Sequence, residues 1–294
     1  MRKNIINEEF LQQIEALQSL IRNNVAGQFG GTHQSKTYGS SCEFADYRDY
    51  IPGDDITKID WNAYARFDKL YQKLYLDERQ MHTKIYIDAS RSMEYGRADK
   101  ADQALRLAAT IAYLSLSEMD KVSVYAIREK EIVTIISGMV GKDSFVTEVG
   151  KLNELEFSGD SYISDAIMPS SVGYGDGMSV IISDFLTDNN YEDAINYLAD
   201  KKRDVFCIQV LSPDELNPKL RGKVHLYDSE SNDRFYRRNI KRDIMQAYRK
   251  ALEYATNRID ELCASRGAKY LLASSEDEMG DIFFGSLVEK EVLK

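Results

Sequence analysis

The chain has 294 residues, of which 43% are hydrophobic, and this is enough apolar material for a large globular core. Its formal net charge of -10 argues against a dedicated nucleic-acid-binding protein, because a phosphate backbone is bound by a concentrated basic surface. Cys42, Cys207 and Cys263 are odd in number and show no C-x-x-C spacing, so we expect reduced thiols in a cytoplasmic protein rather than disulfides or a zinc site.

The first 26 residues are expected to form an N-terminal amphipathic helix. Apolar residues recur at spacings of three and four between residues 5 and 21. Glu8, Glu9 and Glu15 interrupt the region in which a signal peptide would need an apolar run. The longest nearly apolar stretch, 105–117, falls short of the roughly 20 residues that cross a bilayer. We therefore expect no export signal and no membrane span.

Residues 27–80 differ in composition from the rest of the chain. Several glycines come first, and a Pro52-Gly53 turn signal follows among abundant aromatic residues. This pattern predicts a small β-rich module of short strands and turns.

Residues 81–294 alternate regularly between apolar strands and helices. Such alternation predicts an α/β fold, a doubly wound and mostly parallel sheet with helices on both faces. We interpret the basic segment 234–242 as the solvated start of a helix, with anion or nucleic-acid binding as the alternative. The predicted strands are 83–88, 121–127, 131–137, 178–185, 204–211 and 269–273, and the predicted helices lie near 98–118, 142–154, 190–201 and 239–265, with a further helix closing the domain.

Polar side chains follow two of these strands. The first strand runs into Asp88, Ser90 and Ser92, which have the spacing D-x-S-x-S, and Asp184 sits at the end of the apolar run "VIIS" within 178–185. Between them a Gly-led turn places Ser161 before a short helix. Ligands of doubly wound sheets bind beyond the carboxyl ends of the strands, so these oxygens are expected at one edge. Two carboxylates and three hydroxyls favour Mg²⁺ or Mn²⁺ over zinc or copper.

This set of residues resembles the metal-ion-dependent adhesion site of the von Willebrand factor type A domain. The resemblance implies that Ser90, Ser92, Ser161 and Asp184 contribute to metal binding and that Asp88 holds metal-bound waters. The family usually has Thr where this chain has Ser161, and Ser164 is the alternative ligand. The coordination position left open is one that a partner's Asp or Glu would fill.

The block "GSSCEFADYRDYIPGDDITKIDWNAYARFDKLYQKLYLDE" is similar to the signature of the family catalogued as domain of unknown function fifty-eight. We expect Trp61, Tyr50 and Phe44 to pin the module to the sheet, and the arginines to pair with nearby aspartates. The signature residues of structural interest are Glu43, Arg48, Gly53, Asp54, Asp60, Trp61 and Arg66.

Three functions are compatible with these features. The first is a non-enzymatic module that docks a partner carboxylate on a bound Mg²⁺; the family resemblance implies work with a MoxR-type AAA+ ATPase in assembly or chaperoning. The second is a metal-dependent phosphohydrolase, although the chain lacks a D-x-D pair, a phosphate-binding loop and a histidine near the site. The third is a structural domain with an empty metal site.

Overall fold

The computed structural model describes residues 4–25, 44–75, 80–94, 99–175, 177–187, 189–220, 222–227 and 235–283. By their contacts the residues form two compact units. The larger comprises Met1–Ala26 and Met81–Leu293, and the smaller comprises Gly27–Gln80. Each unit has a sheet of its own.

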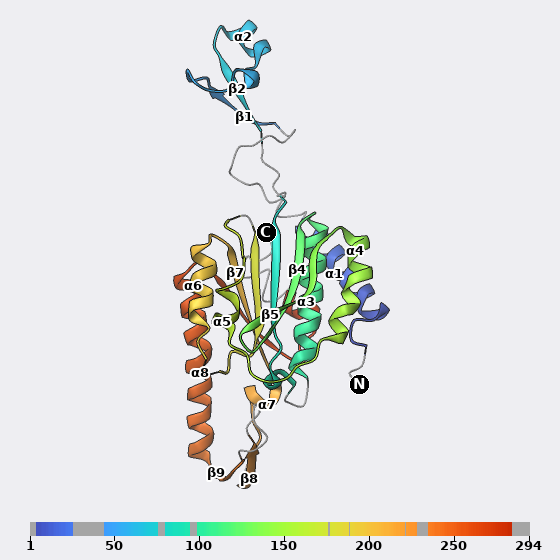
Figure 1. The fold of residues 1–294 in the computed structure, drawn as a ribbon, viewed down its shortest axis with the longest axis vertical. Coiled ribbons are helices and arrows are strands. Elements are labelled where there is room, and N and C mark those ends of the chain that lie inside the picture. Colours follow the sequence, from blue (N-terminus) through green and yellow to red (C-terminus); the bar gives the residue numbers. More distant parts are fainter. Residues whose placement is uncertain are drawn as a thin grey trace. The chain divides into compact units, whose positions relative to one another are not determined.

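A six-stranded sheet with the order β10-β7-β6-β3-β4-β5 forms the centre of the larger unit (Figure 1). Strand β5 pairs antiparallel with β4, and the other pairings are parallel, which confirms the predicted α/β, mostly parallel sheet. The chain proceeds outward from β3 to β5, then returns to β6 beside β3 and continues to β10, so the order reverses between β3 and β6. The strands are β3 (His82–Asp88), β4 (Lys121–Arg128), β5 (Glu131–Val140), β6 (Met178–Ser183), β7 (Asp204–Leu211) and β10 (Lys269–Ser274).

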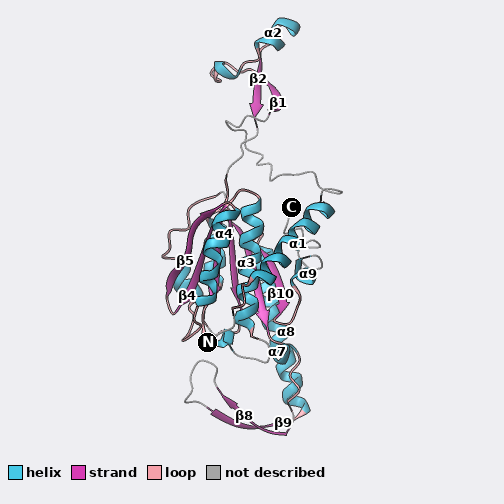
Figure 2. Cartoon of the chain, turned by 90° about the vertical axis from the view of Figure 1, so that its right-hand side faces the viewer, coloured by secondary structure: helices cyan, strands magenta, loops and turns pink. Residues whose placement is uncertain are grey.

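Helices α1, α3 and α4 lie on one face of this sheet (Figure 2). The apolar stripe of the N-terminal segment packs into this core, where Ile14 is only 1% exposed. Asn153 Oδ1 accepts hydrogen bonds from the backbone amides of Ile5 and Ile6, which fixes the entry of this segment. The elements are α1 (Glu8–Val25), α3 (Lys100–Ser117), α4 (Lys142–Glu148) and the 3₁₀ helix η3 (Val149–Glu154), joined by the short α9 (Met279–Asp281).

The other face is covered by α5 (Ile163–Ile167), α6 (Glu192–Asp200) and α8 (Arg242–Ser265). Helix α8 buries Ile259 and Cys263 near its C-terminal end, whereas most of its first half is exposed. Cys207 and Cys263 are buried thiols, and Cys42 lies outside the described residues.

The sequence predicted that the basic segment 234–242 is the start of a helix, and this prediction was wrong. Phe235–Ile240 is strand β9, which pairs antiparallel with β8 (Gly222–Tyr227), and α8 begins only at Arg242. In this hairpin Arg238 pairs with Val224 and Arg237 pairs with His225. Because these polar residues lie within the strands, the hairpin lacks the long apolar runs of the central sheet.

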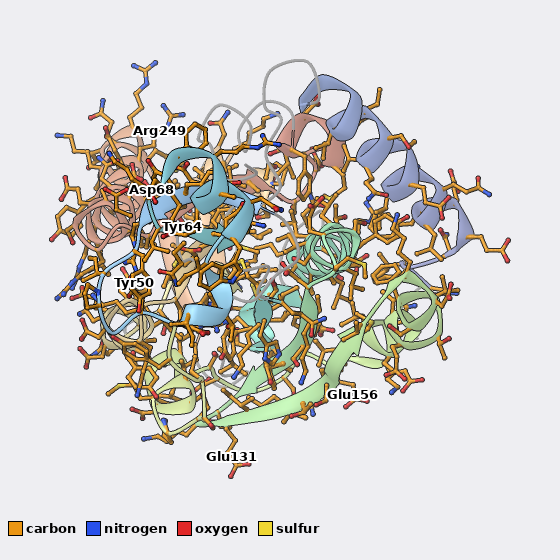
Figure 3. All side chains as sticks on the ribbon, turned by 90° about the horizontal axis from the view of Figure 1, so that it is seen from above. Tyr50, Tyr64, Asp68, Glu131, Glu156 and Arg249 are labelled. Atoms are coloured by element: carbon orange, nitrogen blue, oxygen red, sulfur yellow. The ribbon has the colours of Figure 1, made fainter. Side chains whose placement is uncertain are left out.

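Strand β5 lies at the edge of the sheet, where unpaired backbone groups favour association with other strands. Its first residue, Glu131, is exposed and points away from the sheet (Figure 3). A charge at this position disfavours edge-to-edge pairing. Among the described helices, none is both long and apolar enough to cross a membrane.

The smaller unit contains a two-stranded antiparallel sheet of β1 (Phe44–Asp49) and β2 (Tyr71–Tyr75). Between them lie the 3₁₀ helix η1 (Ile56–Lys58) and the helix α2 (Trp61–Phe67). The expectation of strands and turns alone was therefore incomplete. The helix was missed because its start is set by one capping side chain, Asp60, rather than by a long apolar period.

Candidate functional site

The reversal of strand order between β3 and β6 brings two acidic residues together. Asp88 is the last residue of β3, and Asp184 directly follows β6, the parallel neighbour of β3. Both are 3% exposed. Ser183 Oγ donates to Asp88 Oδ2 at 2.6 Å, so the two strand ends are also joined through a side chain.

A third loop lies against the residues that follow β3. The Ser158 amide donates to the Ala89 carbonyl at 2.8 Å, and the Arg91 amide donates to the Gly159 carbonyl at 2.9 Å. Gly159 has a φ of 70°, and a Cβ there would lie 2.6 Å from Glu129 Oε1. The positive φ therefore favours glycine in the turn that delivers Ser161.

The serines of this edge differ in how their hydroxyls are satisfied. Ser90 Oγ and Ser92 Oγ share one hydrogen bond of 3.0 Å. Ser161 is 5% exposed, and its Oγ has no hydrogen-bond partner among the described residues. Ser164 Oγ, by contrast, accepts the Ala194 amide at the start of α6 at 3.0 Å. A hydroxyl engaged in holding a helix is a poor alternative ligand, so the geometry favours Ser161.

Asp88 carries the least compensated charge of the site. Its Oδ1 accepts the Ser90 amide at 2.9 Å and its Oδ2 accepts the Ser183 hydroxyl. Burial raises the pKa of this carboxyl above its ordinary value of 3.8, and the negative charge of Asp184 raises it further. A cation beside Asp88 would relieve both effects.

Asp184 already has a cation. Lys100 Nζ lies 2.8 Å from Asp184 Oδ2 and 2.7 Å from Glu215 Oε1, and the lysine side chain is 1% exposed. Burial by itself disfavours the ammonium, but the two carboxylates outweigh it and raise the pKa of Lys100. Glu215 belongs to α7 (Pro213–Leu216), which lies beyond the carboxyl end of β7 (Figure 1). The motif-based interpretation missed Lys100 and Glu215.

One signal in the sequence points to Lys100. It is the first residue of α3, a helix whose next two turns are almost wholly buried, and Asp99 is the N-cap. The positive end of a helix dipole disfavours a cation there, and burial disfavours it further. A lysine at such a position therefore requires carboxylate partners from elsewhere in the chain.

The residues of this edge fit a small hard cation such as Mg²⁺ or Mn²⁺. The donors are carboxylate and hydroxyl oxygens, and Ser161 Oγ is a buried oxygen without a partner. Asp184 was expected to be a metal ligand, but both of its carboxylate oxygens already have partners. Its Oδ2 forms an ion pair with Lys100, and its Oδ1 accepts a hydrogen bond from the Leu186 amide at 3.1 Å. Asp88, Ser90, Ser92 and Ser161 would hold the ion, with Asp184 contributing less.

Two further observations bear on the chemistry. Within the described ranges no group of three or more His, Cys, Asp or Glu residues is arranged to hold a metal ion. His82 is at the opposite end of β3 from Asp88, where its ring nitrogen contacts Ser123 Oγ at 2.9 Å. Burial and the neighbouring cationic side chains, among them Lys84 and Lys121, lower the pKa of His82 to about 4.

The signature residues of the smaller unit mainly satisfy one another. Arg48 donates to Asp54 at 2.7 Å, one of the arginine-aspartate pairings that we predicted, and also to Gln72 Oε1 at 2.9 Å. Gly53 has a φ of 110° in the turn before Asp54. Glu43 lies outside the described residues, as does the side chain of Phe44.

Asp60 organises the remainder of this unit. Its Oδ1 caps α2 by accepting the amides of Asn62 and Ala63. Its Oδ2 accepts the Tyr47 hydroxyl at 2.8 Å and lies 3.2 Å from Lys73 Nζ. The hydrogen bond from Tyr47 is the main cause that lowers the pKa of Asp60 to about 2, followed by those from the backbone.

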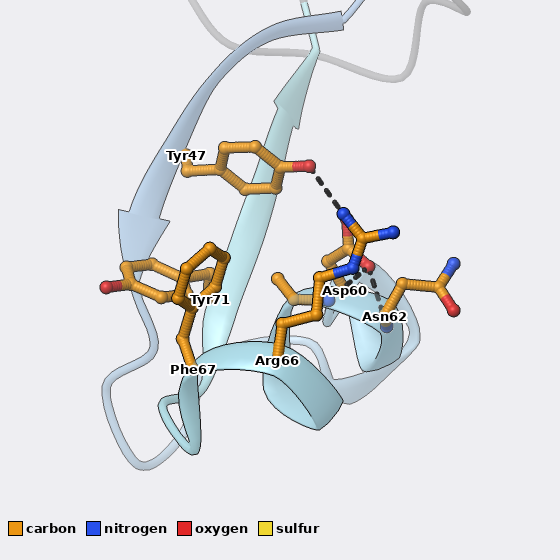
Figure 4. Close-up of a pocket in the computed structure, with 7 residues that line it drawn as sticks. Tyr47, Asp60, Asn62, Arg66, Phe67 and Tyr71 are labelled. Atoms are coloured by element: carbon orange, nitrogen blue, oxygen red, sulfur yellow. Dashed lines mark hydrogen bonds between the residues drawn. The ribbon is translucent and has the colours of Figure 1, made fainter.

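A pocket of about 500 Å³ opens beside Asp60 (Figure 4). It is lined by Tyr47, Asn62, Ala63, Arg66, Phe67 and Tyr71 as well as Asp60. Trp61 is 61% exposed and makes an edge contact with Tyr64. Whether Trp61 and Tyr50 pin this unit to the sheet concerns the relation between the units, and it stays a prediction.

Comparison with known proteins finds a family match and relatives in mycobacteria. The family model "Protein of unknown function DUF58" matches residues 46–258. The "Uncharacterized protein Rv1480" of Mycobacterium tuberculosis and the "Uncharacterized protein Mb1516" of Mycobacterium bovis are each 26% identical to it over 239 residues, which are 79% of this chain and 74% of the relative.

Similar solved structures include the VWA domain of SpRpn10, with 9% identity and a TM-score of 0.39, covering 70% of this chain and 94% of that chain. Another is the pilus adhesin SpaC from Lactobacillus rhamnosus GG in an open conformation, with 12% identity and a TM-score of 0.42, covering 89% of this chain and 36% of that one. Scores at this level carry no argument about function.

Proposed function

Since the chain belongs to the DUF58 family of proteins of unknown function, we propose its role from the chemistry of its own site. The protein is a non-enzymatic interaction module. It docks an Asp or Glu side chain of a protein partner at the carboxyl edge of the sheet, on a Mg²⁺ or Mn²⁺ ion held by Asp88, Ser90, Ser92 and Ser161.

The observation that carries this proposal is the unsatisfied hydroxyl of Ser161. A buried polar atom without a partner costs about 1–3 kcal/mol, and a bound ion or water removes that cost. Ser161 Oγ lies in the loop bound to the residues that follow Asp88, and Asp88 itself is a buried carboxylate with a raised pKa. A hard cation satisfies both groups at once.

The composition of the site supports docking of an external carboxylate. Of the four residues assigned to the ion, only Asp88 is charged, so a divalent ion held by them keeps excess positive charge. Neutral hydroxyl ligands leave such an ion attractive to a further anionic ligand. The metal supplies this attraction when bound, and the protein supplies the orientation.

Hydrolysis is less well supported than docking. His82 lies at the other end of β3 with its pKa lowered to about 4, and no other histidine of the described residues is part of this edge. A general base is therefore not evident beside the serines. The alternative of a structural domain whose site stays empty is separated from docking by the experiment below.

The resemblance to the family suggests that the partner is a MoxR-type AAA+ ATPase and that the pair acts in assembly or chaperoning in the cytoplasm. The chemistry of the site requires only a protein with an accessible acidic side chain. An ATPase with an acidic loop or C-terminus meets that requirement.

The test is an affinity capture from native lysate with wild type in Mg²⁺, wild type in EDTA, and Ser92→Ala in Mg²⁺. Ser92 is preferable to Asp184 as the altered residue, because its hydroxyl makes one shared hydrogen bond while Asp184 holds buried Lys100. Ser164→Ala is the matched control, since it also removes one hydroxyl but at the α6 contact.

The docking proposal predicts a protein retained by wild type and Ser164→Ala in Mg²⁺ and lost in the other two samples. Direct binding of that protein, purified, should show the same metal dependence. Identical proteins in all four samples would contradict metal-dependent docking and shift attention to the surface around Trp61.

A further inference from the structure

Lys100 Nζ contacts two carboxylates at once, Asp184 at 2.8 Å and Glu215 at 2.7 Å, and the lysine side chain is 1% exposed. We propose that Lys100 is a built-in counter-ion of the candidate metal site. It holds two carboxylates away from the metal position, which weakens the site's own metal affinity and keeps the bound ion receptive to an external carboxylate. This inference rests on the proposed function.

The first step is the placement of the two carboxylates. Asp184 shares the switch-point edge with Asp88, and Glu215 reaches the same lysine from α7. Glu215 is thus linked to Asp184 through Lys100, and we take it as the internal substitute for a partner's acidic side chain. Anything that holds Glu215 in place also keeps the open position available.

The second step is how firmly Glu215 is held. Its Oε1 accepts Lys100 Nζ at 2.7 Å, and its Oε2 accepts the Ser212 amide at 2.7 Å and the Ser212 hydroxyl at 3.0 Å. Both oxygens are therefore engaged, and the side chain is 19% exposed. The capping box with Ser212 fixes the carboxylate, and Lys100 provides the opposite charge.

The third step is charge. Asp88, Asp184 and Glu215 carry three formal negative charges and Lys100, which contacts the latter two, carries one positive charge, so two negative charges are formally uncompensated. One divalent ion neutralises them. Without Lys100, Asp184 would be released toward the ion, which would then bind more tightly and keep less positive charge for an external carboxylate. Lys100 therefore lowers the affinity of the site for the metal ion and raises the affinity of the bound ion for an anionic partner.

The experiment measures Mn²⁺ binding by calorimetry and, in parallel, the water-proton relaxation of bound Mn²⁺, which reports the waters left on the ion. Lys100→Met removes the charge with little change in length. Lys84→Met is the matched control, because Lys84 is also a buried lysine but donates to the backbone carbonyl of Ser171.

We expect Lys100→Met to bind Mn²⁺ at least tenfold more tightly than wild type, about 1.4 kcal/mol, and to lose relaxation enhancement as carboxylates replace water. Lys84→Met should match wild type. In Lys100→Met/Glu215→Gln, part of the relaxation enhancement should return because one carboxylate is absent. In the double variant Asp184 is still freed from Lys100. If Lys100→Met alone fails to fold, the double variant therefore tests the predicted increase in Mn²⁺ affinity.

The outcomes separate this inference from the proposed function. Equal Mn²⁺ affinity of wild type and folded Lys100→Met overturns the inference and leaves metal-dependent docking intact. Binding by Lys100→Met but not by wild type supports the inference and contradicts the proposed function. Absence of binding by both overturns the two together.

Discussion

Replacement of Asp88 by Asn should stabilise the metal-free protein while removing its response to Mg²⁺. Burial and the charge of Asp184 raise the pKa of Asp88, so the folded chain binds this proton more tightly than the unfolded chain. The stability that the proton provides is present at low pH and is lost as the pH rises above 3.8 and through the folded pKa.

Asn retains the shape of Asp88 and most of its contacts. The side-chain oxygen of the introduced asparagine can accept a hydrogen bond from the Ser90 amide. Its NH₂ group can donate to Ser183 Oγ, which in wild type donates to the Asp88 carboxylate. At neutral pH in EDTA we therefore expect Asp88→Asn to have a higher free energy of unfolding than wild type, because the buried negative charge is removed.

Mg²⁺ should stabilise wild type and leave the stability of Asp88→Asn unchanged. At a hundredfold excess over its dissociation constant, a ligand stabilises by about 2.7 kcal/mol. In a domain of this size that corresponds to roughly 5–10 °C in Tm. Wild type should show this increase and Asp88→Asn should not, because the charged ligand is absent.

Thermal unfolding followed by circular dichroism, in EDTA and in Mg²⁺ and at several pH values, measures both effects. Asp165→Asn is the control, because its ion pair with Lys130 is exposed on both sides. The reasoning is refuted if Asp88→Asn melts below wild type in EDTA at neutral pH and still gains stability from Mg²⁺.

Three further predictions concern single side chains. Ser161→Ala should leave the stability of the metal-free protein unchanged or higher, since no hydrogen bond is lost, and calorimetry should show weaker Mn²⁺ binding. Its control, Ser164→Ala, should lose about 1 kcal/mol of stability because the hydrogen bond to α6 is removed, and it should bind Mn²⁺ as wild type does. Ile14→Ala, at a position 1% exposed, should lower the free energy of unfolding by about 2–5 kcal/mol in denaturant titration, whereas Leu20→Ala, 52% exposed, should have little effect. The lowered pKa of Asp60 means that its stabilisation of α2 is present above the ordinary 3.8 and is lost as the pH falls toward about 2, which hydrogen exchange of the first α2 amides will detect.

The fold and the edge that carries the site were predictable from the sequence because both depend on local patterns. Apolar runs ending in Asp88 and Asp184 identify buried parallel strands, and the carboxyl ends of such strands meet at one edge. The β8-β9 hairpin was not predictable in this way. Its second strand contains Arg237 and Arg238, and its pairing comes from backbone hydrogen bonds rather than from an apolar period.

The partners of Lys100 were also beyond reach of sequence patterns. Glu215 lies 115 residues along the chain, and nothing local links the two. What the sequence does show is an unfavourable position for a lysine, the first turn of a buried helix. An unfavourable local placement indicates that a compensating contact exists, but only the fold identifies that contact.

The two groups of motif residues differ in a way that separates structural from functional roles. In the smaller unit, Arg48 pairs with Asp54, and Asp60 accepts hydrogen bonds at both carboxylate oxygens, so these signature groups are satisfied inside the unit. At the sheet edge, Ser161 Oγ has no partner among the described residues, and Asp88 is buried without a cation beside it there. Satisfied polar groups account for a fold, whereas a buried polar group without a protein partner is satisfied by water or by a further ligand. The signature therefore specifies how the smaller unit folds, and the D-x-S-x-S edge is where binding should be tested.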